Sequence, residues 1–171
     1  TGDIAITSTA AGASSVGNLA ANAATGDISV SAATLTVGSS SAGATTALTS
    51  TVGDLTTGAV TSGSNASLTS AGALTTGNIT STTGSISLDA GGVITSGDLT
   101  ALSGSISIAN ILGTITTGLV SLSDDFTLST SSDLDLAGVT AGDDIRITTS
   151  GTGAFGTLTA TGLGTDNDND G

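Results

Sequence analysis

The densest group of residues that could bind a ligand lies close to the C-terminus. Asp166, Asp168 and Asp170 alternate with asparagines and precede a glycine. This order matches the opening D-x-D-x-D-G of an EF-hand-type loop, in which alternate carboxylates converge on one Ca²⁺ and the glycine permits a sharp turn. The sequence contains no bidentate acid at the twelfth position of such a loop. Residues 163–171 are therefore predicted to be either a truncated calcium-type loop, with these three acids as its metal ligands, or a solvated acidic tail.

A second set of acids recurs at a fixed place in a repeated motif. Asp27, Asp125 and Asp144 each precede an alternating apolar segment, and Asn65 and Ser85 take the same place in other copies. Such a column could bind a row of Ca²⁺ ions. Short polar side chains also cap turns by accepting hydrogen bonds from nearby backbone N–H groups. We favour capping, because the column mixes Asp with Ser and Thr.

Residues for acid–base or nucleophilic catalysis are scarce. The chain has no His, Lys, Cys or Tyr, and Asp143, Asp144 and Arg146 form the only dense cluster before the C-terminal motif. Cleavage of polysaccharides needs a general base, paired carboxylates or a cation that stabilises developing charge. The sequence therefore predicts no enzyme, no catalytic residue and no cofactor apart from the candidate calcium. A polysaccharide-acting β-helix enzyme is the least favoured alternative.

Two rows of hydroxyl side chains raise a different function. One row contains Thr57, Thr76, Ser96 and Thr117, and the other contains Thr61, Thr80, Thr100 and Ser121. Regular flat arrays of outward Thr are how some β-solenoids bind ice. Outward Thr also follows from the preference of β-branched residues for strands. Because Ser interrupts both rows, we expect no ice shaping, and an ice-binding β-solenoid stays an alternative function.

The column of acids and the two rows of hydroxyl residues recur because the chain is a repeat of about twenty residues. One apolar position recurs at steps of twenty, and its members are Leu48, Leu68, Leu88, Ile108 and Leu128. The longest step, 24 residues from Ile6 to Val30, predicts an insertion within residues 9–15. A constant register over many copies is the signature of stacked coils, in which each residue lies above its equivalent in the next turn.

Each repeat has the pattern of short strands separated by corners. Apolar and polar residues alternate with period two, and Ile, Val and Thr favour strands. A helix is excluded because 26 glycines are spread along the chain, and each costs about 1 kcal/mol in a helix interior. Strands are predicted over residues 85–88, 93–95 and 98–101 of one repeat. Residues 1–162 are thus predicted to form an all-β, right-handed parallel β-solenoid of about eight rungs, with three short strands per rung.

The same pattern predicts the direction of the side chains. Ile86, Leu88, Ile94 and Leu99 are expected to point inward, and Ser and Thr are expected to point outward. Glycines at the corners are expected to supply the positive φ that tight corners need.

The charge of the chain excludes several partners. Fourteen acids oppose a single base, which gives a net charge of −13. Nucleic acids and anionic membranes both require a basic surface. No run approaches the eighteen apolar residues of a spanning helix. The sequence therefore predicts neither nucleic-acid binding nor membrane insertion, and the absence of Met predicts an internal or processed piece of a longer protein.

Residues 84–100 (GSISLDAGGVITSGDLT) resemble the haemagglutinin-type repeat of filamentous haemagglutinin-like adhesins, which are bacterial two-partner-secretion exoproteins. The shared features are the G-[DNS]-I-x-[IL] alternation and the A-G-G that follows it, and the resemblance extends to about Gly162. It implies a secreted, extracellular protein of the bacterial cell surface. The chain would be a stalk or fibre segment that serves adhesion and biofilm formation. The partners would be neighbouring rungs of the parent chain, identical subunits stacked end to end, and host or matrix glycans.

Overall fold

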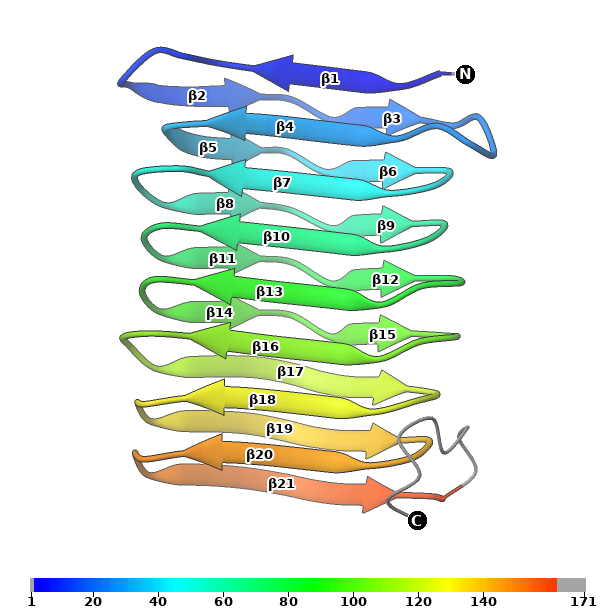
Figure 1. Cartoon of the computed structure of the whole chain (residues 1–171), viewed down its shortest axis with the longest axis vertical. Coiled ribbons are helices and arrows are strands. Elements are labelled where there is room, and N and C mark those ends of the chain that lie inside the picture. The colour runs from blue at the N-terminus through cyan, green and yellow to red at the C-terminus, as the bar shows by residue number, and fades with distance from the viewer. Residues whose placement is uncertain (1, 163–171) are drawn as a thin grey trace.

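Residues 2–162, which the computed structural model describes, coil into a right-handed parallel β-solenoid (Figure 1). The rungs follow one another from the N-terminal rung at the top of Figure 1 to the C-terminal rung at the bottom. The described residues contain strands and turns but no helix. All strand pairs are parallel, as the predicted fold requires.

The strands form two sheets that lie on opposite sides of the core. Sheet A has eight strands: β1 (Ile4–Thr7), β4 (Ile28–Ala32), β7 (Thr46–Ser50), β10 (Ala66–Ser70), β13 (Ile86–Ala90), β16 (Ile106–Asn110), β18 (Phe126–Thr130) and β20 (Ile145–Thr149). Sheet B has thirteen strands: β2 (Ala13–Val16), β3 (Leu19–Ala21), β5 (Thr34–Val37), β6 (Ser40–Ala42), β8 (Leu55–Thr57), β9 (Val60–Ser62), β11 (Leu74–Thr76), β12 (Ile79–Ser81), β14 (Ile94–Ser96), β15 (Leu99–Ala101), β17 (Ile115–Leu122), β19 (Leu134–Ala141) and β21 (Gly153–Ala160).

The prediction of three strands per rung is confirmed for the first five rungs only. Each of these rungs contributes one strand to sheet A and two short strands to sheet B, such as β13, β14 and β15. In the last three rungs the two segments of sheet B join into the eight-residue strands β17, β19 and β21. The break between the two short strands of sheet B is therefore present in the first five rungs and absent from the last three.

The register agrees with the repeat found in the sequence. Leu88 pairs with Leu68 on one side and with Ile108 on the other, at the predicted steps of twenty residues. The insertion in the first rung lies partly elsewhere than predicted. The segment from Leu19 to Ile28 spans nine positions, whereas its equivalent in the next rung spans six, so much of the extra length is in the corner between β3 and β4.

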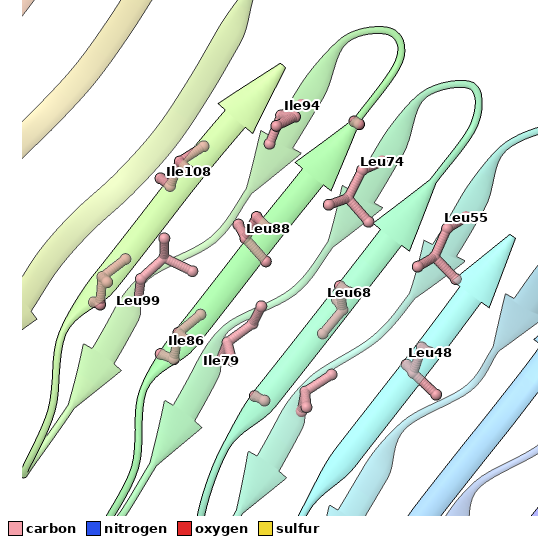
Figure 2. Packing of buried hydrophobic residues seen from close by; sticks show 14 of the residues in the cluster. Leu48, Leu55, Leu68, Leu74, Ile79, Ile86, Leu88, Ile94, Leu99 and Ile108 are labelled. Atoms are coloured by element: carbon pink, nitrogen blue, oxygen red, sulfur yellow. The ribbon is translucent and has the colours of Figure 1, made fainter. Parts of the chain in front are cut away.

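The core is a stack of apolar side chains enclosed between the two sheets. Ile86, Leu88, Ile94 and Leu99 are each at most 1 % exposed, which confirms that they point inward. Figure 2 shows them lying between the sheets, with Leu88 next to Ile108 of the following rung. Burial of one such side chain contributes about 1.5–3 kcal/mol. The stack is one continuous cluster, so each rung is stabilised mainly by the rungs on either side of it.

Buried serines close the corners between the sheets. The Ser62 hydroxyl lies 2.7 Å from the carbonyl oxygen of Ala44 in the preceding rung and 2.8 Å from that of Asn65 in its own rung. The same arrangement recurs at Ser50, Ser70 and Ser81. The prediction that Ser and Thr point outward is therefore wrong at these corners. A buried hydroxyl is tolerated there because it has carbonyl oxygens of the corner within hydrogen-bond distance.

Glycines at the corners serve a purpose other than the one predicted. Among the glycines of residues 2–162, only Gly113 and Gly162 have a positive φ. At Gly58 a Cβ atom would overlap the backbone oxygen of Gly38 in the preceding rung, and Gly91 is equally confined. These glycines are required because neighbouring backbones approach closely, not because the chain needs a left-handed conformation.

Candidate functional site

A column of short polar side chains lies immediately before the strands of sheet A. We call it the cap column, and it consists of Asp3, Asp27, Thr45, Asn65, Ser85, Ser105, Asp125 and Asp144. Asp27 Oδ1 accepts hydrogen bonds from the backbone N–H of Thr45 at 2.9 Å and from its hydroxyl at 2.6 Å. Asn65 Oδ1 accepts the N–H of Ser85 at 2.9 Å. These contacts are the capping interactions that the sequence predicts, and each joins one rung to the next.

Similar caps occur at other corners of the solenoid. Asp133 Oδ1 accepts both the backbone N–H and the hydroxyl of Thr152 at 2.8 Å. Asp98 Oδ1 accepts the N–H of Leu119 at 2.9 Å. In each case the acceptor belongs to one rung and the donor to the following rung. The caps made by Asp and Asn therefore have the same direction, whereas Ser123 and Ser132 accept N–H groups of the preceding rung, from Gly104 and Gly113.

Two of these carboxyls have a lowered pKa for the same reason. The hydroxyl and the backbone N–H of Thr45 hold the pKa of Asp27 below its ordinary value. The backbone N–H and the hydroxyl of Thr152 do the same to the pKa of Asp133. Hydrogen bonds to a carboxylate favour its charged form. Both groups are therefore ionised at neutral pH and act as charged acceptors.

Three acids converge at one corner near the C-terminal end of the rod. Single carboxylate oxygens of Asp124, Asp125 and Asp143 all lie within 4.8 Å of one another, and the three residues are half-buried. Carboxylate oxygens are the ligands that Ca²⁺ takes, so this group is the candidate metal-ligating cluster of the described residues. Acidic groups are also stable on protein surfaces as solvated charges.

The sequence located this cluster only in part. It placed Asp143 together with Asp144 and Arg146, whereas in the structure Asp143 lies with Asp124 and Asp125 of the preceding rung. Arg146 lies on the outer face of β20, opposite Thr127 of β18. Asp124 could have been found by aligning the two rungs, because it and Asp143 both stand one position before a cap residue.

The calcium-type motif at the C-terminus lies outside the described residues. Asp166, Asp168 and Asp170 are therefore not placed, and their role as metal ligands stays a prediction.

The first of the two predicted hydroxyl rows faces the core. Its members, Thr57, Thr76, Ser96 and Thr117, are at most 8 % exposed. The prediction that this row points outward is wrong, because Leu55 is buried and the alternation of a strand then places Thr56 outward and Thr57 inward. The hydroxyl oxygens of Thr57 and Ser96 are buried without a hydrogen-bond partner.

The outer face of sheet B carries two columns of hydroxyl residues. The first, which we call the outer threonine column, contains Thr36, Thr56, Thr75, Thr95 and Thr116. The second contains Thr61, Thr80, Thr100 and Ser121, as predicted, and continues through Thr140 and Thr159. The outer threonine column runs over five rungs without a serine or a charged residue. This column was not predicted, because the second residue of each hydroxyl pair, such as Thr57 in Thr56-Thr57, was expected to point outward in place of the first.

Two hollows on the outer surface bring no acid and base together. One is lined by Leu119, Val139 and neighbouring apolar or hydroxyl residues, and none of its lining residues is titratable. The other lies over the corner beside Ile111, and Asp89 is the only titratable residue in its lining. Neither hollow has the paired groups that general acid–base catalysis needs.

Comparisons with known proteins find no relative: no family model, no curated protein and no solved structure matches the chain. Within residues 2–162, no helix has the length and apolar character needed to cross a membrane.

Proposed function

We propose that this chain is a stalk or fibre segment of a secreted bacterial surface adhesin, with a structural and not a catalytic role. The observation that carries the proposal is the unbroken register of the rungs, in which eight strands of sheet A pair in chain order. The haemagglutinin-type pattern of residues 84–100 supports the location at the cell surface. The lack of an acid–base pair in either hollow supports a role without catalysis.

The fold is suited to forming a long rod from a short sequence repeat. Strands in one sheet are about 4.8 Å apart, so eight rungs give a rod roughly 40 Å long. Each rung contacts only its neighbours, and the length of such a rod grows in proportion to the number of rungs. Backbone hydrogen bonds run along the axis, and the caps and the corner serines add further bonds in the same direction. A stalk needs this combination of length and stiffness.

Removal of whole rungs tests the proposal. Deletion of residues 66–105 joins Asn65 to Ile106 and removes two rungs, because Ala66, Ile86 and Ile106 occupy one column. We expect the shortened protein to fold, and its rod to be about 10 Å shorter. On intact cells that display it, the protein should stay accessible to antibody and should retain adhesion.

The matched control is deletion of residues 66–95, which removes one and a half rungs and joins a cap residue to a segment of the other sheet. This variant should lose the β-sheet circular dichroism signal and the surface display. Complete loss of adhesion after the in-register deletion, with fold and display intact, would contradict a purely structural role. It would instead locate a binding site within the two deleted rungs.

Ice binding is a second candidate, and the outer threonine column favours it. Its five threonines present hydroxyl and methyl groups at the constant rung spacing of about 4.8 Å, and no charged side chain interrupts them. Thermal hysteresis of the purified chain is the measurement. Hysteresis lost in Thr75→Lys but kept in Ser87→Lys, a variant on the opposite sheet, would establish ice binding. No hysteresis in the wild type would remove this candidate.

A further inference from the structure

Two hydroxyl groups lie deep in the core of the second and third rungs. Ser40 of β6 and Thr46 of β7 are 2 % and 1 % exposed, and neither hydroxyl oxygen has a hydrogen-bond partner among the described residues. The corner serine Ser62 differs, because its hydroxyl reaches two carbonyl oxygens. A buried polar group without a partner destabilises a fold, and most such groups in proteins pair with protein or with ordered water. These two hydroxyls therefore call for a ligand.

The two hydroxyls face each other across the core. Ser40 occupies the column of Ile79 in sheet B, and Thr46 occupies the column of Ile86 in sheet A. Figure 2 shows Ile79 and Ile86 next to each other between the sheets, and their strands β12 and β13 are in contact. Ser40 and Thr46 have the same relation two rungs earlier, and β6 and β7 are likewise in contact. Polar atoms from opposite sheets thus point into one place.

The side chains around this place are small. Val60 follows Ser40 in its column, and Ala66 follows Thr46. All four side chains are smaller than the isoleucine that comes next in the column. The leucines of β7, β8, β10 and β11 lie in the same rungs, are fully buried and keep the two sheets apart. The sheets are thus held at the separation that large side chains need, and space remains between the four small ones.

We infer that a structural water molecule binds in the core between Ser40 and Thr46. Water suits this place because it is small and both donates and accepts hydrogen bonds, so one molecule satisfies both hydroxyls. A strand carbonyl, whose oxygen has a second lone pair beside its ladder bond, offers a third hydrogen bond. The water links sheet A to sheet B at a level where the apolar side chains are small. This site depends on the fold and the register alone, and not on the function proposed for the chain.

Magnetic relaxation dispersion of solvent deuterons, which counts long-lived internal waters, provides the test. The double variant Ser40→Ala/Thr46→Val removes both hydroxyls with little change in shape. It should hold one long-lived water fewer than the wild type. Thr57→Val is the matched control, because it removes an unpaired buried hydroxyl from the same rung as Thr46 and should leave the count unchanged. An equal count in the wild type and the double variant overturns the inference.

Urea unfolding of the single variants gives an independent readout. Ser40→Ala and Thr46→Val should each lower the folding equilibrium constant about fivefold or more, because the water then keeps only one of its two hydroxyl partners. The two effects should not add in the double variant, since both substitutions act on the same water. Hydroxyls that bind no water would instead give single variants at least as stable as the wild type, and that result contradicts the inference. Circular dichroism establishes that every variant is folded.

Discussion

The direction of the side chains in β13 is open to a sharp test, and Leu88 is the residue to change. It is 1 % exposed and lies between Leu68 and Ile108. Leu88→Ala leaves a cavity that cannot collapse, because the backbone ladders hold the rungs about 4.8 Å apart. We expect a loss near the upper end of the 2–5 kcal/mol range for such changes, about 4 kcal/mol. A domain of this size then loses about 8–16 °C in Tm, measured by circular dichroism.

A charge at the same position should be still more damaging. Leu88→Asp buries a carboxylate with no cation nearby, because the single base of the chain, Arg146, is on β20, three rungs away and about 14 Å along the axis. Burial raises the pKa of such a carboxyl in the folded state, so the damage should be least below its unfolded pKa of about 3.9 and should grow as the pH rises through the folded pKa. Ser87→Asp is the control, since Ser87 is exposed and lies between two serines. It should change stability by less than about 0.5 kcal/mol. Equal damage from both aspartates would refute the register.

Three further substitutions test the buried hydroxyls and the caps. Thr57→Val should leave the free energy of unfolding, measured with urea, unchanged or raise it by up to about 1 kcal/mol. The buried hydroxyl has no hydrogen-bond partner, and Val37 takes the same position in the preceding rung. A clear loss of stability would mean that the hydroxyl is hydrogen-bonded. Ser81→Ala should lower the free energy of unfolding by about 1–3 kcal/mol, because two corner carbonyls lose their donor. Asp27→Asn tests the cap. Because the pKa of Asp27 is lowered in the folded state, its carboxylate stabilises the fold above the unfolded pKa of about 3.9, and this stabilisation is lost as the pH falls through the folded pKa. The difference in Tm between Asp27→Asn and the wild type should therefore disappear in acid. A difference independent of pH would contradict the charged cap.

The apolar columns could be predicted from the sequence, and the hydroxyl columns could not. Leu48, Leu68 and Leu88 recur at a constant step of twenty residues and are all buried. Large apolar side chains lie on one face of each strand, so burial of the other face would expose them to solvent. Ser and Thr give no such signal, because they occupy both faces: Ser62 is buried at a corner and Thr61 beside it is exposed. In a narrow core a hydroxyl can reach a corner carbonyl, so burial does not select against it.

The glycines and the acid cluster show a second limit. A glycine in the sequence does not reveal whether it serves a positive φ, as at Gly113, or a close approach between rungs, as at Gly58. Asp124 and Asp143 are far apart in the sequence and meet only once the rungs are aligned. The role of each glycine and the acid cluster both depend on contacts between rungs. The sequence pattern within a single rung does not reveal these contacts.

Rung lengths vary, and the structure explains where the variation is allowed. The two inward columns of sheet B are always five residues apart, for example from Leu55 to Val60 and from Leu134 to Val139. An extra residue there would turn one column to solvent, because side chains alternate between the two faces of a strand. The corner from Leu19 to Ile28, by contrast, spans nine positions where the next rung has six. A corner faces solvent, and added length there costs only a little more loop entropy. The repeat therefore keeps its register while its length varies, and the variation is confined to the corners.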